Sequence, residues 1–228
     1  MLTDRQTAVA VGTLFLTATA TYLTADTLIG SALRRPDFLI AAAVDVVAMK
    51  TAALLALVCG IANVAIALLV YPLLKHHSLR LALGYVALRV GELGPLLLYL
   101  AAPLLLVALS EGLLDGSVDT SAANHLGLLL QALYAVSLRM VFLFTGMSGI
   151  VFAYLLYRTK LIPRPIAALG LIGYPLLIVG AILYMFHLID FLQGVGLLFA
   201  WVVGLFELIL PMWLIIRGFN KPAEQLPA

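Results

Sequence analysis

Charged residues are scarce in this chain: Asp, Glu, Lys and Arg make up 11% of its 228 residues, whereas soluble domains contain about one quarter. Apolar residues account for 64% of the chain, and its mean hydropathy is +1.15. This small number of polar side chains cannot cover the surface of a water-soluble domain. We therefore expect lipid to be the solvent for most of the chain. The composition therefore excludes a soluble globular protein and predicts an integral membrane protein.

The chain also lacks a strong charge imbalance and a set of cysteines. Thirteen Lys and Arg oppose eleven Asp and Glu, giving a formal net charge of +2, which is too small and too dispersed to suggest a nucleic-acid partner. The single cysteine, Cys59, lies inside an apolar run, so neither an intramolecular disulfide nor a cysteine-based metal cluster can form. We therefore expect no cofactor and no nucleic-acid partner.

Six apolar runs are long enough to cross a bilayer. A helix rises about 1.5 Å per residue, so a span needs about 20 apolar residues. We predict membrane helices over residues 7–33, 50–74, 81–109, 126–157, 165–186 and 195–216. A further apolar segment, residues 37–49, is too short to span and predicts a short interfacial or re-entrant helix between the first and second spans. The fold class is therefore an all-α polytopic transmembrane bundle, with residues 1–228 in a single transmembrane domain.

Positive charges gather in alternate loops of this predicted bundle. Lys75 and Arg80 lie between the second and third spans. Arg158, Lys160 and Arg164 lie between the fourth and fifth spans. Because cytoplasmic loops are enriched in Lys and Arg, we expect these loops and both termini to face the cytoplasm. The sequence thus predicts a multi-pass protein of the cytoplasmic (inner) membrane that contacts membrane lipids, and it leaves a homo-oligomer open.

Four ionisable residues fall about halfway along predicted spans: Arg89, Glu92, Arg139 and Glu207. An ionisable side chain at this depth is costly unless it is paired or hydrated, so each is a candidate functional residue. Helical spacing places them on faces that are expected to point into the bundle. Two Arg and two Glu also sum to zero formal charge, as a low-dielectric interior requires of groups that stay ionised.

Three further polar side chains complete the candidate ligand-binding set. Asn63 lies at a similar depth in the second span, and Tyr85 and Tyr99 share the face of the third span that carries its charges. The two arginines would hold an anionic group, and the two glutamates would balance them or accept a cation or a proton. The favoured function is binding or transport of a small polar or amphipathic molecule, or a lipid, through an interior charged pocket.

Two other functions stay open at this point. A mutually satisfied ion network that only fixes helix register, in a scaffold or partner subunit without chemistry, would look the same in sequence. Alternatively, His125, His187 and Asp190 could form an outward-facing metal site. That site would belong to a membrane enzyme acting on a lipid or another hydrophobic substrate. Enzymatic activity is thus open, although the residues favour a protein that is not an enzyme.

Several stretches of the sequence resemble one membrane family. They are Tyr71 to His77, Leu81 to Tyr85 followed by Arg89 and Glu92, Leu161 to Arg164, Leu169 to Gly173, and Glu207 with Trp213 to Phe219. On these motifs the chain resembles the bacterial and archaeal integral-membrane domain-of-unknown-function family four-three-eight-six. The resemblance covers most of the chain and implies a multi-helix membrane protein. Because that family has no assigned activity, the resemblance carries over no site residue.

Overall fold

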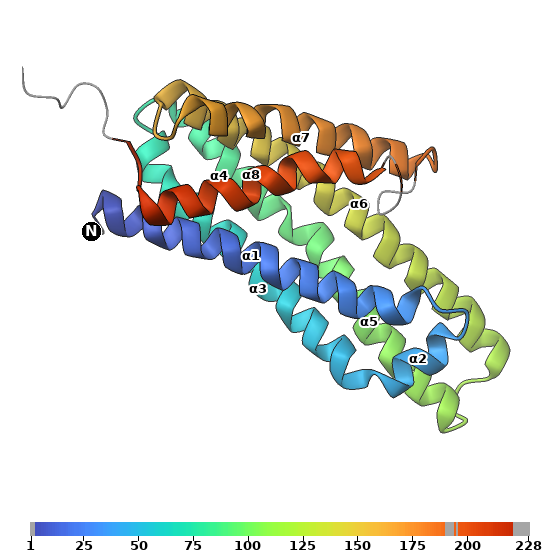
Figure 1. Cartoon of the computed structure of the whole chain (residues 1–228). Helices are drawn as coiled ribbons and strands as arrows, with labels where there is room; N and C mark the ends of the chain where they lie inside the picture. Colours follow the sequence, from blue (N-terminus) through green and yellow to red (C-terminus); the bar gives the residue numbers. More distant parts are fainter. Residues whose placement is uncertain (1–2, 190–193, 195, 221–228) are drawn as a thin grey trace, which may run out of the picture. The chain divides into compact units, whose positions relative to one another are not determined.

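The computed structural model describes residues 3–189, 194 and 196–220, and it is all-helical. The helices, labelled in Figure 1 where there is room, are α1 (Asp4–Leu33), α2 (Phe38–Val44), α3 (Val46–Leu74), α4 (Leu79–Gly91), α5 (Leu93–Leu114), α6 (Thr120–Thr159), α7 (Arg164–Met185) and α8 (Gly196–Ile216). Six stretches are long and apolar enough to cross a membrane, with α4 and α5 together forming the third. The predicted fold class is confirmed, and each predicted span overlaps one of these helical stretches.

Many outward-facing side chains of these helices are large and apolar. Val47, Leu54 and Trp201 are 80%, 64% and 62% exposed, respectively. In a water-soluble bundle such positions would be polar, because exposed apolar area costs free energy in water. Exposing these side chains to lipid tails does not have this free-energy cost. The chain is therefore a multi-pass membrane protein.

The third span is divided into two helices at Glu92. The hydroxyl of Ser78 caps the start of α4 by accepting a hydrogen bond from the backbone N–H of Leu81 (3.4 Å). α4 ends at Gly91, four residues before Pro95. Proline has no backbone N–H, and its ring clashes with the carbonyl of the residue four positions earlier, so Pro95 interrupts the helix at this point. The interruption places Glu92 at a helix junction in the middle of the span.

The predicted interfacial segment forms a helix that is shorter than expected. α2 ends before Asp45, and the residues from Val46 onward belong to α3, so the predicted end at residue 49 was wrong. α2 has 7 residues, a length of about 10 Å, which is too short to span a bilayer. It packs against α5, and the side chains of Phe38 and Leu39 lie against Gly127 of α6.

The chain forms two compact units. Unit 1 comprises the described residues of 1–17, 62–92 and 139–228, and unit 2 comprises residues 18–61 and 93–138. The single domain over residues 1–228 stays a prediction.

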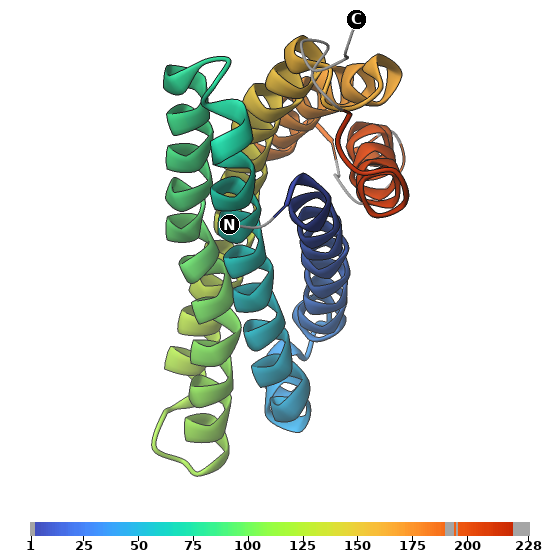
Figure 2. The ribbon, with the colours of Figure 1, turned by 90° about the vertical axis from the view of Figure 1, so that its left-hand side faces the viewer.

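In unit 1, α7 and α8 lie side by side (Figures 1 and 2) and run antiparallel. A Cβ on Gly173 would lie 3.0 Å from the backbone of Val203, and one on Gly170 would lie 2.9 Å from the ring of Phe206. Small residues allow membrane helices to approach this closely, and van der Waals packing then replaces the hydrophobic effect that is weak in lipid. This contact fixes the middle of α7 against the middle of α8, where the site described next is located.

Candidate functional site

A buried ion pair lies at the junction of α4 and α5. Arg89, in the last turn of α4, places Nη1 2.9 Å from Oε2 of Glu92, and the two side chains are 2% and 6% exposed. The hydroxyl of Thr145 on α6 donates a hydrogen bond to the other carboxylate oxygen, Oε1, at 2.8 Å. Both oxygens of Glu92 therefore have a short hydrogen bond, one of them from a cation. Such charge-assisted bonds are about twice as strong as neutral ones.

One face of α6 contacts three side chains of the buried cluster. Thr145, Gly149 and Phe152 follow at helical spacing and share this face. Gly149 lies directly under the ring of Tyr174 from α7, where a Cβ would overlap the ring atoms. Phe152 stacks on the ring of Tyr85 from α4, with ring centroids 5.0 Å apart and an interplanar angle of 11°. Glu92, Tyr174 and Tyr85 therefore contact neighbouring turns of α6, through Thr145, Gly149 and Phe152 respectively.

The contact between α7 and α8 adds a second carboxylate. The hydroxyl of Tyr174 donates a hydrogen bond to Oε1 of Glu207 at 3.3 Å, and the charges of Arg89 and Glu92 act on Glu207. Glu207 is half-buried. Pro211 stands four residues later, so the backbone carbonyl of Glu207 lacks its usual helical N–H donor. We call this group the interior polar site; its members are Tyr85, Arg89, Glu92, Thr145, Tyr174 and Glu207.

Two buried polar atoms of this site have no hydrogen-bond partner among the described residues. They are the hydroxyl oxygen of Tyr85, which is fully buried, and Nε of Arg89. The guanidinium carbon lies 5.8 Å from the centroid of the Tyr85 ring. Buried polar atoms are nearly always paired, since an unpaired one costs about 1–3 kcal/mol. The Tyr85 hydroxyl and the Arg89 guanidinium act on each other electrostatically, and both atoms can still take a water molecule or a ligand as a hydrogen-bond partner.

Arg139 lies apart from the interior polar site. Its guanidinium stacks over the ring of Tyr184, 4.2 Å from the ring centroid. Tyr184 is one residue from the end of α7, and ten residues, about 15 Å along the helix, separate it from Tyr174. Arg139 pairs with no carboxylate among residues 3–189, 194 and 196–220. The expected balance of two arginines and two glutamates is therefore not present at one place.

Two further expected ligand-binding residues, Asn63 and Tyr99, lie on α3 and α5. Asn63 is half-buried on α3 in unit 1. Tyr99 belongs to unit 2.

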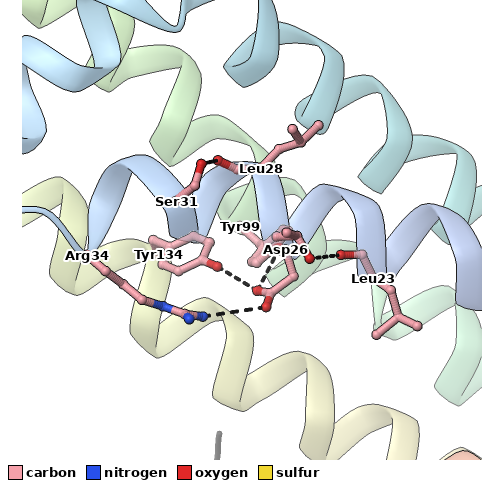
Figure 3. A network of polar contacts seen from close by, with 8 residues as sticks. Leu23, Asp26, Leu28, Ser31, Arg34, Tyr99 and Tyr134 are labelled. Carbon is pink, nitrogen blue, oxygen red and sulfur yellow. Dashed lines mark hydrogen bonds and ion pairs between the residues drawn. The ribbon is translucent and has the colours of Figure 1, made fainter.

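In unit 2, Tyr99 is part of a second polar cluster, which sequence reasoning missed (Figure 3). The hydroxyls of Tyr134 and Tyr99 donate to Oδ1 of Asp26 at 2.7 and 3.4 Å, and the two rings stack 5.0 Å apart. The exposed Arg34 side chain lies 3.8 Å from Oδ2 of Asp26. Asp26 was detectable as an acidic residue inside the first predicted span, but Tyr134 gave no comparable signal.

The two histidines of the predicted metal site do not form one in the described part of the chain. His125 is exposed, and its Nδ1 lies 2.8 Å from the backbone carbonyl of Ser121. His187 is exposed at the end of α7, in the left-handed backbone region at φ 57. Asp190 lies outside the described residues. No group of three or more His, Cys, Asp or Glu side chains among the residues searched could hold a metal ion.

Comparison with known families places the chain. The family model described as Domain of unknown function (DUF4386) matches residues 10–218. The chain belongs to this family. The matched segment contains every member of the interior polar site and of the Asp26 cluster, so both lie within the region that defines the DUF4386 domain. No curated relative matches the chain, and no solved structure matches it.

Proposed function

We propose that this membrane protein binds and transports a small polar or amphipathic molecule, or a lipid, at the interior polar site. The observation that carries the proposal is the pair of buried, unpartnered atoms, the Tyr85 hydroxyl and Arg89 Nε. A network that only fixed helix register would gain stability by pairing both atoms, because each unpaired one costs about 1–3 kcal/mol. A ligand that supplies the missing partners explains why they are retained.

The depth of the site supports transport. Arg89 and Tyr174 each stand ten residues after the start of their helix, which is about 15 Å along it. The hydrocarbon core of a bilayer is about 30 Å thick, so this depth corresponds to the midplane. Ionisable groups at the midplane typically mark the path of a substrate or an ion, and substrate sites of secondary transporters lie there as well.

The expected orientation and membrane are part of the same proposal. Lys75 follows α3, and Arg158 and Arg164 lie at the facing ends of α6 and α7. The enrichment of Lys and Arg in cytoplasmic loops supports a cytoplasmic location for these ends in the cytoplasmic membrane. A reporter enzyme fused after residue 220 and active in the cytoplasm is the expected result. A fusion active on the outer side would overturn this orientation.

Thermal stability of the detergent-purified protein tests the proposed function. The wild type, Tyr85→Phe and Tyr99→Phe are each melted with a panel of lipids, amphipathic metabolites and ions. Tyr85→Phe removes an unpartnered hydroxyl, so its own melting temperature is not expected to fall. We expect at least one compound to raise the melting temperature of the wild type and of Tyr99→Phe, the matched control in unit 2, but not of Tyr85→Phe. If every stabilising compound acts equally on Tyr85→Phe, or if none stabilises the wild type, the proposal is refuted.

A further inference from the structure

The interior polar site holds more acidic than basic groups. Its cation is Arg89, and its two acids are Glu92 and Glu207. Arg139, which could have balanced the second acid, stacks on Tyr184 instead. With all three groups of the site ionised, its net charge would be −1. An uncompensated charge is expensive in a low-dielectric interior, so the site requires one more positive charge.

The two carboxyl groups differ in how well their ionised forms are stabilised. Glu92 has the Arg89 guanidinium at 2.9 Å on one oxygen and the Thr145 hydroxyl at 2.8 Å on the other. Glu207 has one longer hydrogen bond, 3.3 Å from the Tyr174 hydroxyl, and no ion pair within the described part of the chain. Glu92 is therefore the carboxyl that stays ionised, and the missing positive charge belongs at Glu207.

The groups that face Glu207 come from two neighbouring helices. α7 contributes Tyr174, and α4 with its junction contributes Arg89 and Glu92, whose charges act on Glu207 with opposite signs. α1 also packs against α8, through Gly12. The charged residue of α1 in contact with α8 is Arg5, which donates to backbone carbonyls of the last turn rather than to Glu207. The balance at Glu207 is thus set by the interior polar site itself.

We propose that Glu207 carries an exchangeable proton, which is the positive charge that balances the interior polar site. The Tyr174 hydroxyl can donate to the carboxylate or accept from the protonated acid, so its hydrogen bond persists in both states. When a positively charged group of a ligand reaches Glu207, the acid O–H bond breaks, the proton leaves to water, and the carboxylate pairs with the ligand cation. This exchange rests on the proposed function, and it requires a ligand that carries a positive charge. The proton on Glu207 in the ligand-free protein does not depend on the proposed function.

Infrared spectroscopy of the ligand-free protein at near-neutral pH tests the proton directly. A protonated carboxyl has a C=O stretching band well separated from that of a carboxylate. We expect the wild type to show such a band and Glu207→Gln to lose it. Tyr174→Phe, which removes the hydrogen bond to Glu207, should shift the band. Thr145→Val, the matched change at Glu92, should leave its position unchanged. Asp26→Asn, in unit 2, should retain the band.

Four outcomes would overturn the proposal. They are the absence of the band in the wild type, its persistence in Glu207→Gln, its shift in Thr145→Val but not in Tyr174→Phe, and its disappearance when sodium chloride replaces N-methylglucamine chloride at constant pH. The last outcome would assign the balancing charge to a metal ion. The infrared measurement uses no ligand, so the band can appear even if no compound raises the melting temperature. The band can also be absent although a compound does raise it. The two proposals can therefore be refuted separately.

Discussion

Removing Arg89 tests how strongly buried charge is coupled in this protein. Arg89→Gln would leave Glu92, 6% exposed at its side chain, with the Thr145 hydroxyl as its remaining hydrogen-bond partner among the described residues. Loss of one partner from a buried ion pair costs about 3–5 kcal/mol of unfolding free energy. An unfolded chain in detergent also finds polar partners, so we expect a value near the lower end, about 3 kcal/mol.

The variants of this pair should not be equivalent. Glu92→Gln should cost less than Arg89→Gln, because Glu207 can lose its proton and become the counter-ion of Arg89. Arg89→Gln combined with Glu92→Gln should recover most of the loss, because no charge is then left uncompensated. The expected coupling energy of this double-mutant cycle is about 1.5–3 kcal/mol, within the range found for residues in direct contact.

Reversible unfolding in mixed micelles, followed by circular dichroism, measures these free energies. The matched control is the ion pair of Arg35 and Asp37, which is almost equally short at 3.0 Å but has side chains 53% and 45% exposed. Exposed pairs contribute little because solvent screens them, so the same cycle at Arg35 and Asp37 should show a much smaller coupling energy than the buried pair. The reasoning is refuted if Arg89→Gln is as stable as the wild type, if the two buried substitutions are additive, or if both pairs couple equally.

Two further predictions concern the packing of Gly149 and the pKa of Asp37. Gly149→Ala should lower the unfolding free energy by about 1–3 kcal/mol, because the added Cβ overlaps the ring of Tyr174; Gly204→Ala, with nothing within 4 Å, should not, and equal effects would contradict this account. Arg35→Gln should raise the pKa of the Asp37 carboxyl towards its usual value, because hydrogen bonds from Arg35 hold that pKa low. The stabilising interaction of Arg35 with ionised Asp37 is fully present at pH values above the usual Asp pKa. It is lost as the pH falls through the lowered pKa of Asp37. Carboxyl carbon NMR of wild type and Arg35→Gln measures it, and an unchanged pKa would rule out Arg35 as the cause.

The fold was largely predictable because a bilayer imposes one simple requirement, a long apolar run, on every span. Sequence alone placed the six spans for that reason. The break at Glu92 could not have been placed from Pro95 alone, because Pro103 and Pro211 stand inside α5 and α8 without dividing them. The end of the short helix before Asp45 was missed because residues 46–49 are as apolar as those of α2, although Asp45 between them is a residue type that favours helix ends.

The site was harder to predict, because it depends on which helix faces meet. The charged faces of the third and sixth predicted spans were placed by helical spacing alone. On the fourth span, Arg139 drew attention as a charge, but the face that reaches Glu92 carries Thr145 and Gly149. Tyr174 looks like an ordinary core aromatic in sequence, and it becomes a site residue only through its contact with Glu207. Contacts between spans, rather than residue types, determined the membership of the site.

The helix that carries Glu207 also carries all the tryptophan of the protein. The chain has two Trp residues, Trp201 and Trp213, each six positions from Glu207 along α8. Trp201 is 62% exposed on the outer side of its helix, whereas Nε1 of Trp213 is buried. Tryptophan fluorescence therefore reports on this single helix without any label. The two tryptophans differ in their surroundings, so quenchers dissolved in lipid should reach Trp201 first. Replacing Trp201 with Phe would leave Trp213 as the tryptophan signal of α8.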